Sequence, residues 1–382
     1  MQYQLIEDQQ SLNNLCKQLS QASVLAIDTE FVRTRTLYAK LGLLQVCDGV
    51  QLALIDPLAI DDLSPFWQLL TNENITKVLH ACSEDLEVFL TSGQCKPVNL
   101  VDSQIMMSFL GHGLSLGYAA MVKHFTGVEL DKSESRTDWT KRPLTQKQLI
   151  YASADVDYLF SIYPKLLAEI ETVEGIDCLD IIRQESQAMI DKKFTPIDEN
   201  ALYRNIKLNW RLNPKQLNTL KYLASWRYQQ AKMRDLPLGF VAKDHTLMAV
   251  AQSNPETSGA MSNLSGAEAL DLRHKGQAML GVVKQANEVA ISDYPNKIMR
   301  LDEYPGYKQI FKSLKSYFVD LGETLNLPVE NLASKKQINQ FLTWQFDLND
   351  AREEFETVEL LSGWRNNAFG KKLQDFANNN FE

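Results

Sequence analysis

Hydrophobic and polar positions alternate with two different periods in the first half of the chain, which predicts a mixed α/β domain. Short apolar runs typical of strands are separated by stretches in which apolar residues recur every three or four positions. The predicted strands are 3–6, 23–31, 43–46, 52–55, 77–80 and 99–101. The predicted helices are 9–19, 83–91, a stretch from 103, 116–125, 145–167 and 177–192, with Pro143 and Pro164 as breakers.

Two local patterns refine this domain. The runs 43–46 and 52–55 are separated by a short loop that contains Gly49, which predicts a hairpin. Together with the preceding strand, the hairpin gives three antiparallel strands. The segment 127–142 is polar and lacks periodicity, so we expect a loop there.

The second half of the chain shows only the helical period, for example over 217–231, 305–325 and 336–348. The aperiodic segment 194–200 indicates a linker, and 293–302 a second boundary. The predicted division is an α/β domain over 1–193, a linker over 194–209, and two helical bundles over 210–293 and 294–382.

Length and composition agree with several soluble domains. A chain of 382 residues exceeds one ordinary core, because single cores stop growing at about 250–300 residues. The first residues have neither a basic start nor an apolar run, and no stretch approaches a membrane span, so we expect no signal peptide and no membrane partner. The five cysteines form no CxxC pair, which argues against disulfides or zinc and predicts a cytoplasmic protein.

Charge is segregated along the chain. A net charge of −9 and a pI near 5.3 would by themselves argue against a nucleic-acid partner. However, residues 203–234 hold eight Lys or Arg and no acid, whereas 347–359 hold six acids and one Arg. The distribution therefore leaves a basic helical region available for phosphate contacts.

Two carboxylates are expected to converge at the end of the strand 23–31. Asp28 and Glu30 are two residues apart, so both side chains lie on one face of that strand. Like charges this close raise each other's pKa, and a bound divalent cation is the usual way to keep both ionised. For the motif alone, a pair of solvated acids at a strand end is the favoured interpretation.

Three further residues have the same ambiguity when taken singly. Tyr151 and Asp155 lie four apart in a predicted helix and share a face, a spacing that packing residues also show. Asp85 follows a helix start and is explained equally well as a partner of the helix dipole.

Together, the motifs resemble the DEDDy family of 3′-to-5′ exonucleases, and within it the ribonuclease D type. The residues that carry the resemblance are Asp28-Thr29-Glu30-Phe31, His80 through Asp85, Asp138-Trp139, Arg142-Pro143-Leu144, and Tyr151 through Asp155. The resemblance implies an α/β ribonuclease-H-like domain with a mixed sheet flanked by helices. It also implies that Asp28, Glu30, Asp85 and Asp155 hold two Mg²⁺ or Mn²⁺ ions at the scissile phosphate, while Tyr151 orients the attacking water. The expected product is a 5′-nucleoside monophosphate.

Other residues near these motifs have two interpretations each. Phe31 either stacks on the terminal nucleotide or belongs to the core. His80 contacts substrate phosphate or, as the favoured alternative, is structural. Arg142 contacts phosphate or forms a structural salt bridge. Gln45, on the hairpin, is interpreted as structural.

The helical half resembles HRDC domains. The likeness rests on Trp226-Arg227, Ala231 and Asp235-Leu236-Pro237 for the first bundle, and on 325–328, 332–334 and 363–365 for a weaker, divergent match in the second. Such bundles typically bind nucleic acid, which makes Lys221 and Arg227 candidate RNA contacts, with bundle packing or a solvated basic face as the alternative. The acids Glu353, Glu354, Glu356 and Glu359 argue against RNA binding by the second bundle.

The resemblance extends over nearly the whole chain and implies a structured RNA substrate with a short 3′ tail, notably a tRNA precursor. Hydrolysis of DNA in repair is the main alternative, because the same carboxylates hydrolyse DNA and no motif recognises a 2′-hydroxyl. A non-catalytic RNA-binding scaffold is a weaker alternative, since all four acids and Tyr151 are present.

Overall fold

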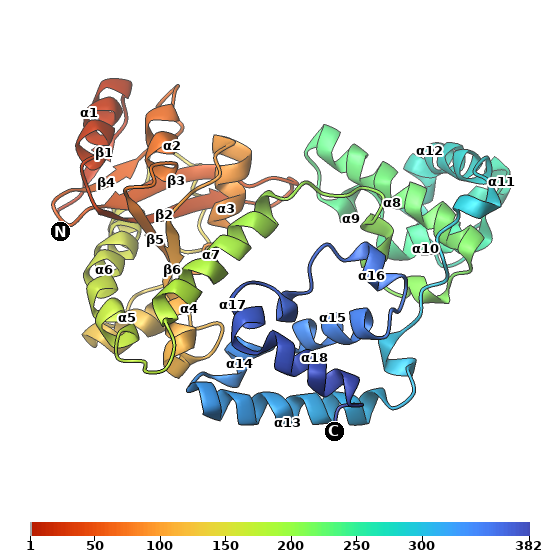
Figure 1. Ribbon diagram of the computed structural model, residues 1–382. Helices are drawn as coiled ribbons and strands as arrows, with labels where there is room; N and C mark the ends of the chain where they lie inside the picture. Colours follow the sequence, from red (N-terminus) through yellow and green to blue (C-terminus); the bar gives the residue numbers. More distant parts are fainter. Residues whose placement is uncertain (1) are drawn as a thin grey trace.

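The computed structural model describes residues 2–382. Residue 1, with which the first predicted domain begins, and the side chain of Glu354 lie outside the described part. A six-stranded mixed sheet has the order β1-β4-β3-β2-β5-β6 (Figure 1). The strands are β1 Gln4–Ile6, β2 Val24–Val32, β3 Lys40–Cys47, β4 Leu52–Ile55, β5 Thr76–Leu79 and β6 Leu100–Asp102.

Helices cover both faces of this sheet. Those of the N-terminal half are α1 Gln9–Leu19, α2 Ser64–Leu70, α3 Asp85–Val88, α4 Ser103–Met107, α5 Tyr118–Thr126, α6 Gln146–Ile170 and α7 Cys178–Phe194. Buried residues of α1, α2 and α3 form one hydrophobic cluster, and those of α4, α5 and α6 form another. The predicted mixed sheet flanked by helices is therefore confirmed, as are the hairpin β3–β4 and the irregular segment 127–142.

Strand β2 lies in the middle of the sheet, and its successive side chains point alternately into the two hydrophobic clusters. Leu25 and Ile27 point to the side of α1 and α2, whereas Ala26 points to the side of α6. β2 pairs with β3 along almost its whole length, but its parallel pairing with β5 extends only from Val24 to Ala26. The C-terminal half of β2 therefore has strand neighbours on one side only, and the other side is open to the loop after β5.

Two helix predictions need correction. Pro164 was expected to break its helix, yet α6 continues through it to Ile170. The reason is tertiary packing, since Leu166 and Ile170 beyond the proline are buried in the core. The helix expected from residue 83 begins only at Asp85, and Ser83 makes no capping hydrogen bond because the N-cap position is Glu84.

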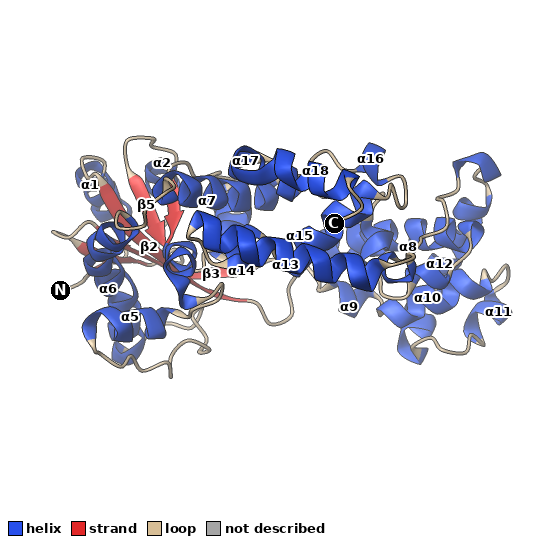
Figure 2. Ribbon diagram, turned by 60° about the horizontal axis from the view of Figure 1, so that its bottom comes forward, coloured by secondary structure: helices blue, strands red, loops and turns tan. Residues whose placement is uncertain are grey.

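After α7 the described chain forms helices and loops and no strand, as Figure 2 shows. The first bundle comprises α8 Pro214–Arg234, α9 Leu238–Val241, α10 Asp244–Ser253, α11 Ser258–Ser262 and α12 Ala269–Asn287. Its buried side chains form a separate cluster that includes Leu217, Leu223 and Leu247. α8 begins with a capping box between Asn213 and Gln216.

The second bundle comprises α13 Tyr307–Leu325, α14 Val329–Leu332, α15 Lys335–Gln345, α16 Ala351–Glu354, α17 Gly363–Arg365 and α18 Lys371–Asn378. Its core is continuous with the cluster around α6. Trp364 packs edge-on against Phe109, and Arg365 forms an ion pair with Glu185 of α7 at 2.5 Å. The second bundle is thus attached to the α/β domain by both apolar and ionic contacts.

The first bundle touches the α/β domain through the connection between β2 and β3. The carboxylate of Asp235, just after α8, accepts hydrogen bonds from the backbone N–H groups of Leu37 and Tyr38, each at 3.0 Å. Within residues 2–382, no helix is both long and apolar enough to cross a membrane. All five cysteines are free and buried.

Candidate active site

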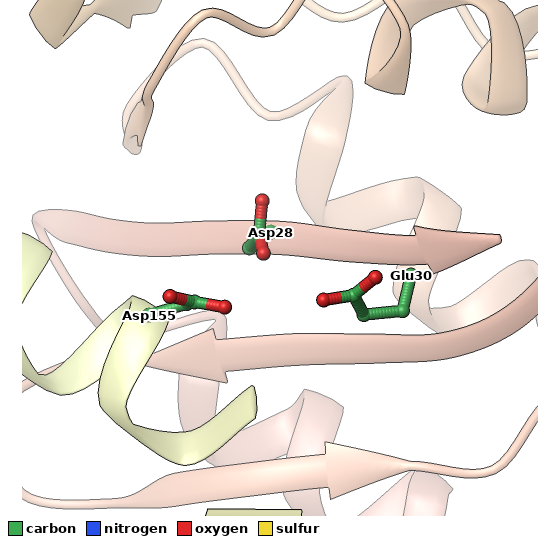
Figure 3. A group of neighbouring side chains, drawn as sticks. All are labelled: Asp28, Glu30 and Asp155. Atoms are coloured by element: carbon green, nitrogen blue, oxygen red, sulfur yellow. The ribbon is translucent and has the colours of Figure 1, made fainter. Parts of the chain in front are cut away.

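Three of the predicted acids converge on the face of the sheet that α6 covers. Asp28 and Glu30 project from β2, and Asp155 projects from α6 toward them (Figure 3). Carboxylate oxygens of the three, one from each, all lie within 4.8 Å of one another. Strand alternation explains the first pair, and the position of α6 over β2 and β3 brings in the third. The arrangement is that of a candidate metal site.

Asp85 reaches the same region from the opposite layer. It is the first residue of α3, and it stands outside the group of three that lies within 4.8 Å. The hydroxyl of Thr29, which points to the α3 side of β2, donates a hydrogen bond to the Asp85 carboxylate. Asp85 therefore approaches β2 along the side that β5 leaves open.

The loop that delivers Asp85 is held by a buried aspartate at the end of β6. The Asp102 carboxylate accepts hydrogen bonds from the backbone N–H groups of Ala81 and Cys82, both at 2.9 Å. Ala81 has a φ of 55°, a left-handed conformation that costs a non-glycine residue free energy. The two hydrogen bonds from Asp102 stabilise this turn between β5 and α3.

Burial raises the pKa of all four carboxyl groups, and repulsion from the other acids adds to this rise for Asp28 and Glu30. Burial raises the pKa of Asp28 well above its usual value, and the charges of Asp85 and Asp155 raise it further. Burial raises the pKa of Glu30 to about 9, with added repulsion from Asp155 and Asp85. Burial alone raises the pKa of Asp155 to about 8.

Asp85 differs from the other three carboxyl groups in accepting a hydrogen bond from a side chain. Burial raises its pKa to about 6, and the hydrogen bond from Thr29 opposes this rise. The pKa of Asp85 therefore lies below those of Asp155 and Glu30. Thr29 therefore helps Asp85 to ionise near neutral pH.

The acids present the donor set that a hard divalent cation requires. Every donor is a carboxylate oxygen, as Mg²⁺ and Mn²⁺ prefer. In the described chain, Asp28, Glu30 and Asp155 form no ion pair with a Lys or Arg. A cation would therefore supply the positive charge that the surrounding side chains do not, and the residues fit the expected metal.

Tyr151 lies one helical turn before Asp155 and beside the acids. Burial and the negative charges of Asp155, Glu30 and Asp28 raise its pKa, so the phenol stays protonated and can donate a hydrogen bond. The hydroxyl of Tyr118 in α5 contacts the same turn of α6 and donates to the backbone carbonyls of Ala154, at 3.2 Å, and Asp155. Tyr118 thereby fixes the backbone that carries Asp155.

A recess of about 250 Å³ adjoins these residues. One wall is formed by α6 and the other by the loop 127–142. The lining residues are Lys147, Ile150, Tyr151, Ala154 and Asp155 of α6 and Glu129, Leu130, Asp131, Ser133 and Glu134 of the loop. The recess therefore combines apolar surface with one basic side chain and several acidic ones. A group bound there would lie directly beside Asp155.

Two residues expected near the substrate are occupied by structural contacts. Nε2 of His80 lies 3.0 Å from the carbonyl oxygen of Leu116, which can only accept, and Nδ1 lies 2.9 Å from the Ser103 hydroxyl. Burial lowers the pKa of His80, so the ring is neutral at pH 7. Neither nitrogen is left for a phosphate, and the structural alternative for His80 is the one that the geometry favours.

Arg142 also takes its structural alternative. Its Nε and one terminal nitrogen donate to both carboxylate oxygens of Asp56, at 2.5 and 2.6 Å. The remaining donors reach the carbonyl oxygens of Gly42, Trp139 and Lys141. The guanidinium joins the loop before α6 to the sheet, and its fork has no donor left for the substrate.

The three other residues predicted to contact the substrate are Phe31, Arg227 and Lys221. Phe31 is half-buried and packs against the cluster on the α1 side of the sheet. Arg227 is buried and pairs with Asp244 at 2.6 Å, and this geometry favours the bundle-packing alternative for Arg227. Lys221 is half-buried on α8, and its role as an RNA contact stays a prediction.

Sequence reasoning missed Thr29, Asp102 and Tyr118 as supports of the site. Thr29 stands between the two acids of the DxE motif, so its side chain points to the opposite face of the strand. This alternation could have suggested that Thr29 contacts a residue on that other face. Asp102 and Tyr118 act through partners 21 and 36 residues away, respectively, and no local pattern in one sequence indicates such pairs.

Fold, acid cluster and helical half together define a 3′-to-5′ exonuclease followed by HRDC-type bundles. Residues 3–171 match the family model described as 3′-5′ exonuclease, residues 216–283 that of the HRDC domain, and residues 305–373 that of the C-terminal HRDC domain of ribonuclease D. The chain belongs to the ribonuclease D family and is a hydrolytic exoribonuclease.

Relatives match this chain over nearly its full length. It is 43% identical to ribonuclease D of Shewanella sp. (strain ANA-3) over 97% of this chain and 93% of that protein. It is 41% identical to ribonuclease D of Serratia proteamaculans, over 98% and 99%. The crystal structure of Escherichia coli RNase D, described as an exoribonuclease involved in structured RNA processing, has a TM-score of 0.93 at 40% identity, with 99% of both chains covered.

Proposed function

We propose that Asp28, Glu30, Asp85 and Asp155 hold two Mg²⁺ or Mn²⁺ ions and that the enzyme removes 5′-nucleoside monophosphates from RNA 3′ ends. The convergence of three carboxylates within 4.8 Å, without a basic partner in the described chain, is the observation that carries this proposal. Asp85, supported by Thr29, supplies the fourth carboxylate from the other layer.

Bound divalent ions would lower the pKa of the attacking water and stabilise the negative charge that develops on the departing 3′ oxygen. The other tasks belong to side chains of this chain. The Tyr151 phenol, kept protonated by its surroundings, donates a hydrogen bond that orients the water. The recess lined by Leu130, Lys147 and Ile150 receives the terminal nucleotide and places its phosphodiester beside Asp155.

The substrate in this proposal is the short 3′ tail of a structured RNA, most specifically a tRNA precursor during 3′ maturation. The relative from Escherichia coli, which is described as acting in structured RNA processing, supports this assignment. Exposed basic residues of the segment 204–234, such as Arg204, Lys207 and Lys232, supply charge that can contact the RNA body.

We also propose the division into an exonuclease domain over 1–193, a linker over 194–209 and two HRDC-type domains over 210–293 and 294–382. The separate cluster around Leu217 and Leu223 supports the first helical domain. A cytoplasmic location belongs to the same proposal and is supported by the five free, buried cysteines.

Matched oligonucleotides test the substrate class. An RNA hairpin with a short 3′ tail and the DNA hairpin of the same sequence are incubated with Mg²⁺, with Mn²⁺ and with chelator, and the products are separated by chromatography. We expect stepwise release of 5′-mononucleotides from RNA with either ion and no release in chelator. Faster hydrolysis of DNA would contradict the RNA assignment and favour a function in DNA repair. Hydrolysis in the presence of chelator would contradict the proposed role of the metal ions.

A further inference from the structure

Gln45 is the one residue beside the acids whose side chain is fully buried yet has neither amide atom hydrogen-bonded within the described chain. Its exposed fraction is 0%, and both Nε2 and Oε1 lack a partner. It lies on β3, in the hairpin strand that runs antiparallel to β2. A buried amide in this state is unusual, because buried polar atoms in proteins almost always have a partner.

Leaving this amide unpaired has an energetic cost. An unsatisfied buried donor or acceptor destabilises the folded state, whereas an apolar side chain of similar shape would carry no such penalty. The neighbours on the same face of β3, Leu43 and Cys47, are apolar and belong to the core. The fold itself therefore provides no stabilising contact that would account for an amide at position 45.

The position of Gln45 relative to the acids suggests what the amide does. Asp28 and Gln45 are direct partners in the β2–β3 ladder. Directly opposite residues point to the same face, and their Cβ atoms lie about 4.5–5.5 Å apart. Gln45 consequently stands next to Asp28, on the face that α6 and Asp155 cover.

We propose that Gln45 is a positioning residue for the metal ligand Asp28. When Asp28 holds the cation, the Gln45 Nε2–H group donates a hydrogen bond to the Asp28 carboxylate and fixes its orientation. The inference rests on the proposed metal site. Ligating carboxylates are generally held by such outer partners, and loss of one reduces metal affinity or activity about 10–100-fold.

The variant Gln45→Met separates this role from a structural one, because methionine has a similar length and shape but no amide. We expect the metal-free variant to unfold at the same or a higher temperature than the unsubstituted protein. We also expect the Mn²⁺ concentration that gives the half-maximal rise in unfolding temperature to increase about 10–100-fold. Half-activation of RNA hydrolysis should shift in parallel.

Tyr317→Phe is the matched control. The Tyr317 hydroxyl is another buried group without a partner in the described chain, but it lies in α13 of the second bundle. Its removal should leave the Mn²⁺ response unchanged. Gln45→Asn, which keeps a shorter amide, should fall between the unsubstituted protein and Gln45→Met in its Mn²⁺ requirement.

An unaltered Mn²⁺ response in a folded Gln45→Met protein would overturn the role of Gln45 while leaving the metal site intact. If Gln45→Met does not fold, Gln45→Leu is measured instead, and failure of both to fold would show that the amide serves the fold. Absence of any Mn²⁺ effect on the unsubstituted protein would instead overturn the proposed metal site, and the role of Gln45 with it.

Discussion

The hydroxyl of Thr29 donates a hydrogen bond to the carboxylate of Asp85, a residue 56 positions further along the chain. Thr29 points away from its neighbours Asp28 and Glu30 because side chains alternate along β2. Through this contact the strand that carries two of the acids also orients the fourth from the opposite layer. The DxE motif thus contributes to the site from both faces of one strand.

Replacement of Thr29 by valine should raise the pKa of Asp85 above about 6, because the hydrogen bond that lowers it is lost. Metal ligands must be deprotonated, so Thr29→Val should need about 10-fold more Mg²⁺ at pH 6.5 and recover toward pH 8.5. Thr29→Ser keeps the hydroxyl and serves as the control. An identical Mg²⁺ requirement for both variants at every pH would contradict the role of Thr29.

The raised pKa values of Glu30, Asp85 and Asp155 predict how the stability of the metal-free protein depends on pH. Each folded-state pKa lies above its unfolded value near 4, at about 9, 6 and 8, so the folded state binds more protons in that interval. Their contribution to stability is complete below about pH 4 and is lost as the pH rises through these values. Chemical denaturation in chelator from pH 5 to pH 9 measures this loss.

Asp155→Asn should reduce that loss, because it removes one buried group that must ionise. We expect its free energy of unfolding in chelator to exceed that of the unsubstituted protein by about 1–3 kcal/mol at pH 8, with little difference at pH 4. Mn²⁺ should stabilise the unsubstituted protein more than the variant. A variant less stable at pH 8 would mean that burial of Asp155 does not cost the folded state free energy.

The Tyr151 hydroxyl should matter for turnover and not for folding. Tyr151→Phe retains the ring that packs near Trp139, at 6.1 Å between centroids, but removes the hydrogen-bond donor. We expect kcat to fall by about 10²-fold, with little change in KM or unfolding temperature. Single-turnover hydrolysis of a labelled RNA is the measurement, and an unchanged rate would remove Tyr151 from the mechanism.

The basic segment should control RNA affinity. Combined replacement of the exposed Lys207, Lys215 and Lys232 by alanine should weaken binding of a hairpin RNA and reduce the slope of log K against log salt by up to about 2. Dinucleotide hydrolysis should change little. Alanine at the exposed Lys308, Lys371 and Lys372 of the second bundle is the control for total charge. Equal losses in both triple variants would contradict a dedicated RNA surface on the first bundle.

The sequence predicted those parts of the protein that depend on local periodicity. Alternation along β2 placed Asp28 and Glu30 on one face, and helical spacing placed Tyr151 beside Asp155. Long-range partners were beyond such reasoning. Arg142 is held by Asp56, 86 residues away, so the partner of its salt bridge, and the choice between its two interpretations, follow only from the folded chain.

The contacts that attach the second bundle to the α/β domain could not be predicted from the sequence either. Trp364 and Arg365 stand in a motif that suggested an HRDC-type core, yet both contact Glu185 of α7. Gln45 illustrates the opposite case, since a polar residue in an apolar strand was visible in the sequence but its neighbour Asp28 was not. Residue type alone therefore does not distinguish a residue that supports the site from a residue of the core. Its neighbours in the folded chain do.

The central claim, that the acid cluster performs hydrolysis while the helical half supplies much of the grip on RNA, is tested most directly with Asp155→Ala. Mg²⁺-dependent trimming and equilibrium binding of one hairpin RNA with a 3′ tail are measured on the same preparation. We predict loss of mononucleotide release with binding affinity within about 3-fold of the unsubstituted protein, a difference below about 1 kcal/mol. Continued Mg²⁺-dependent trimming by Asp155→Ala would contradict the account.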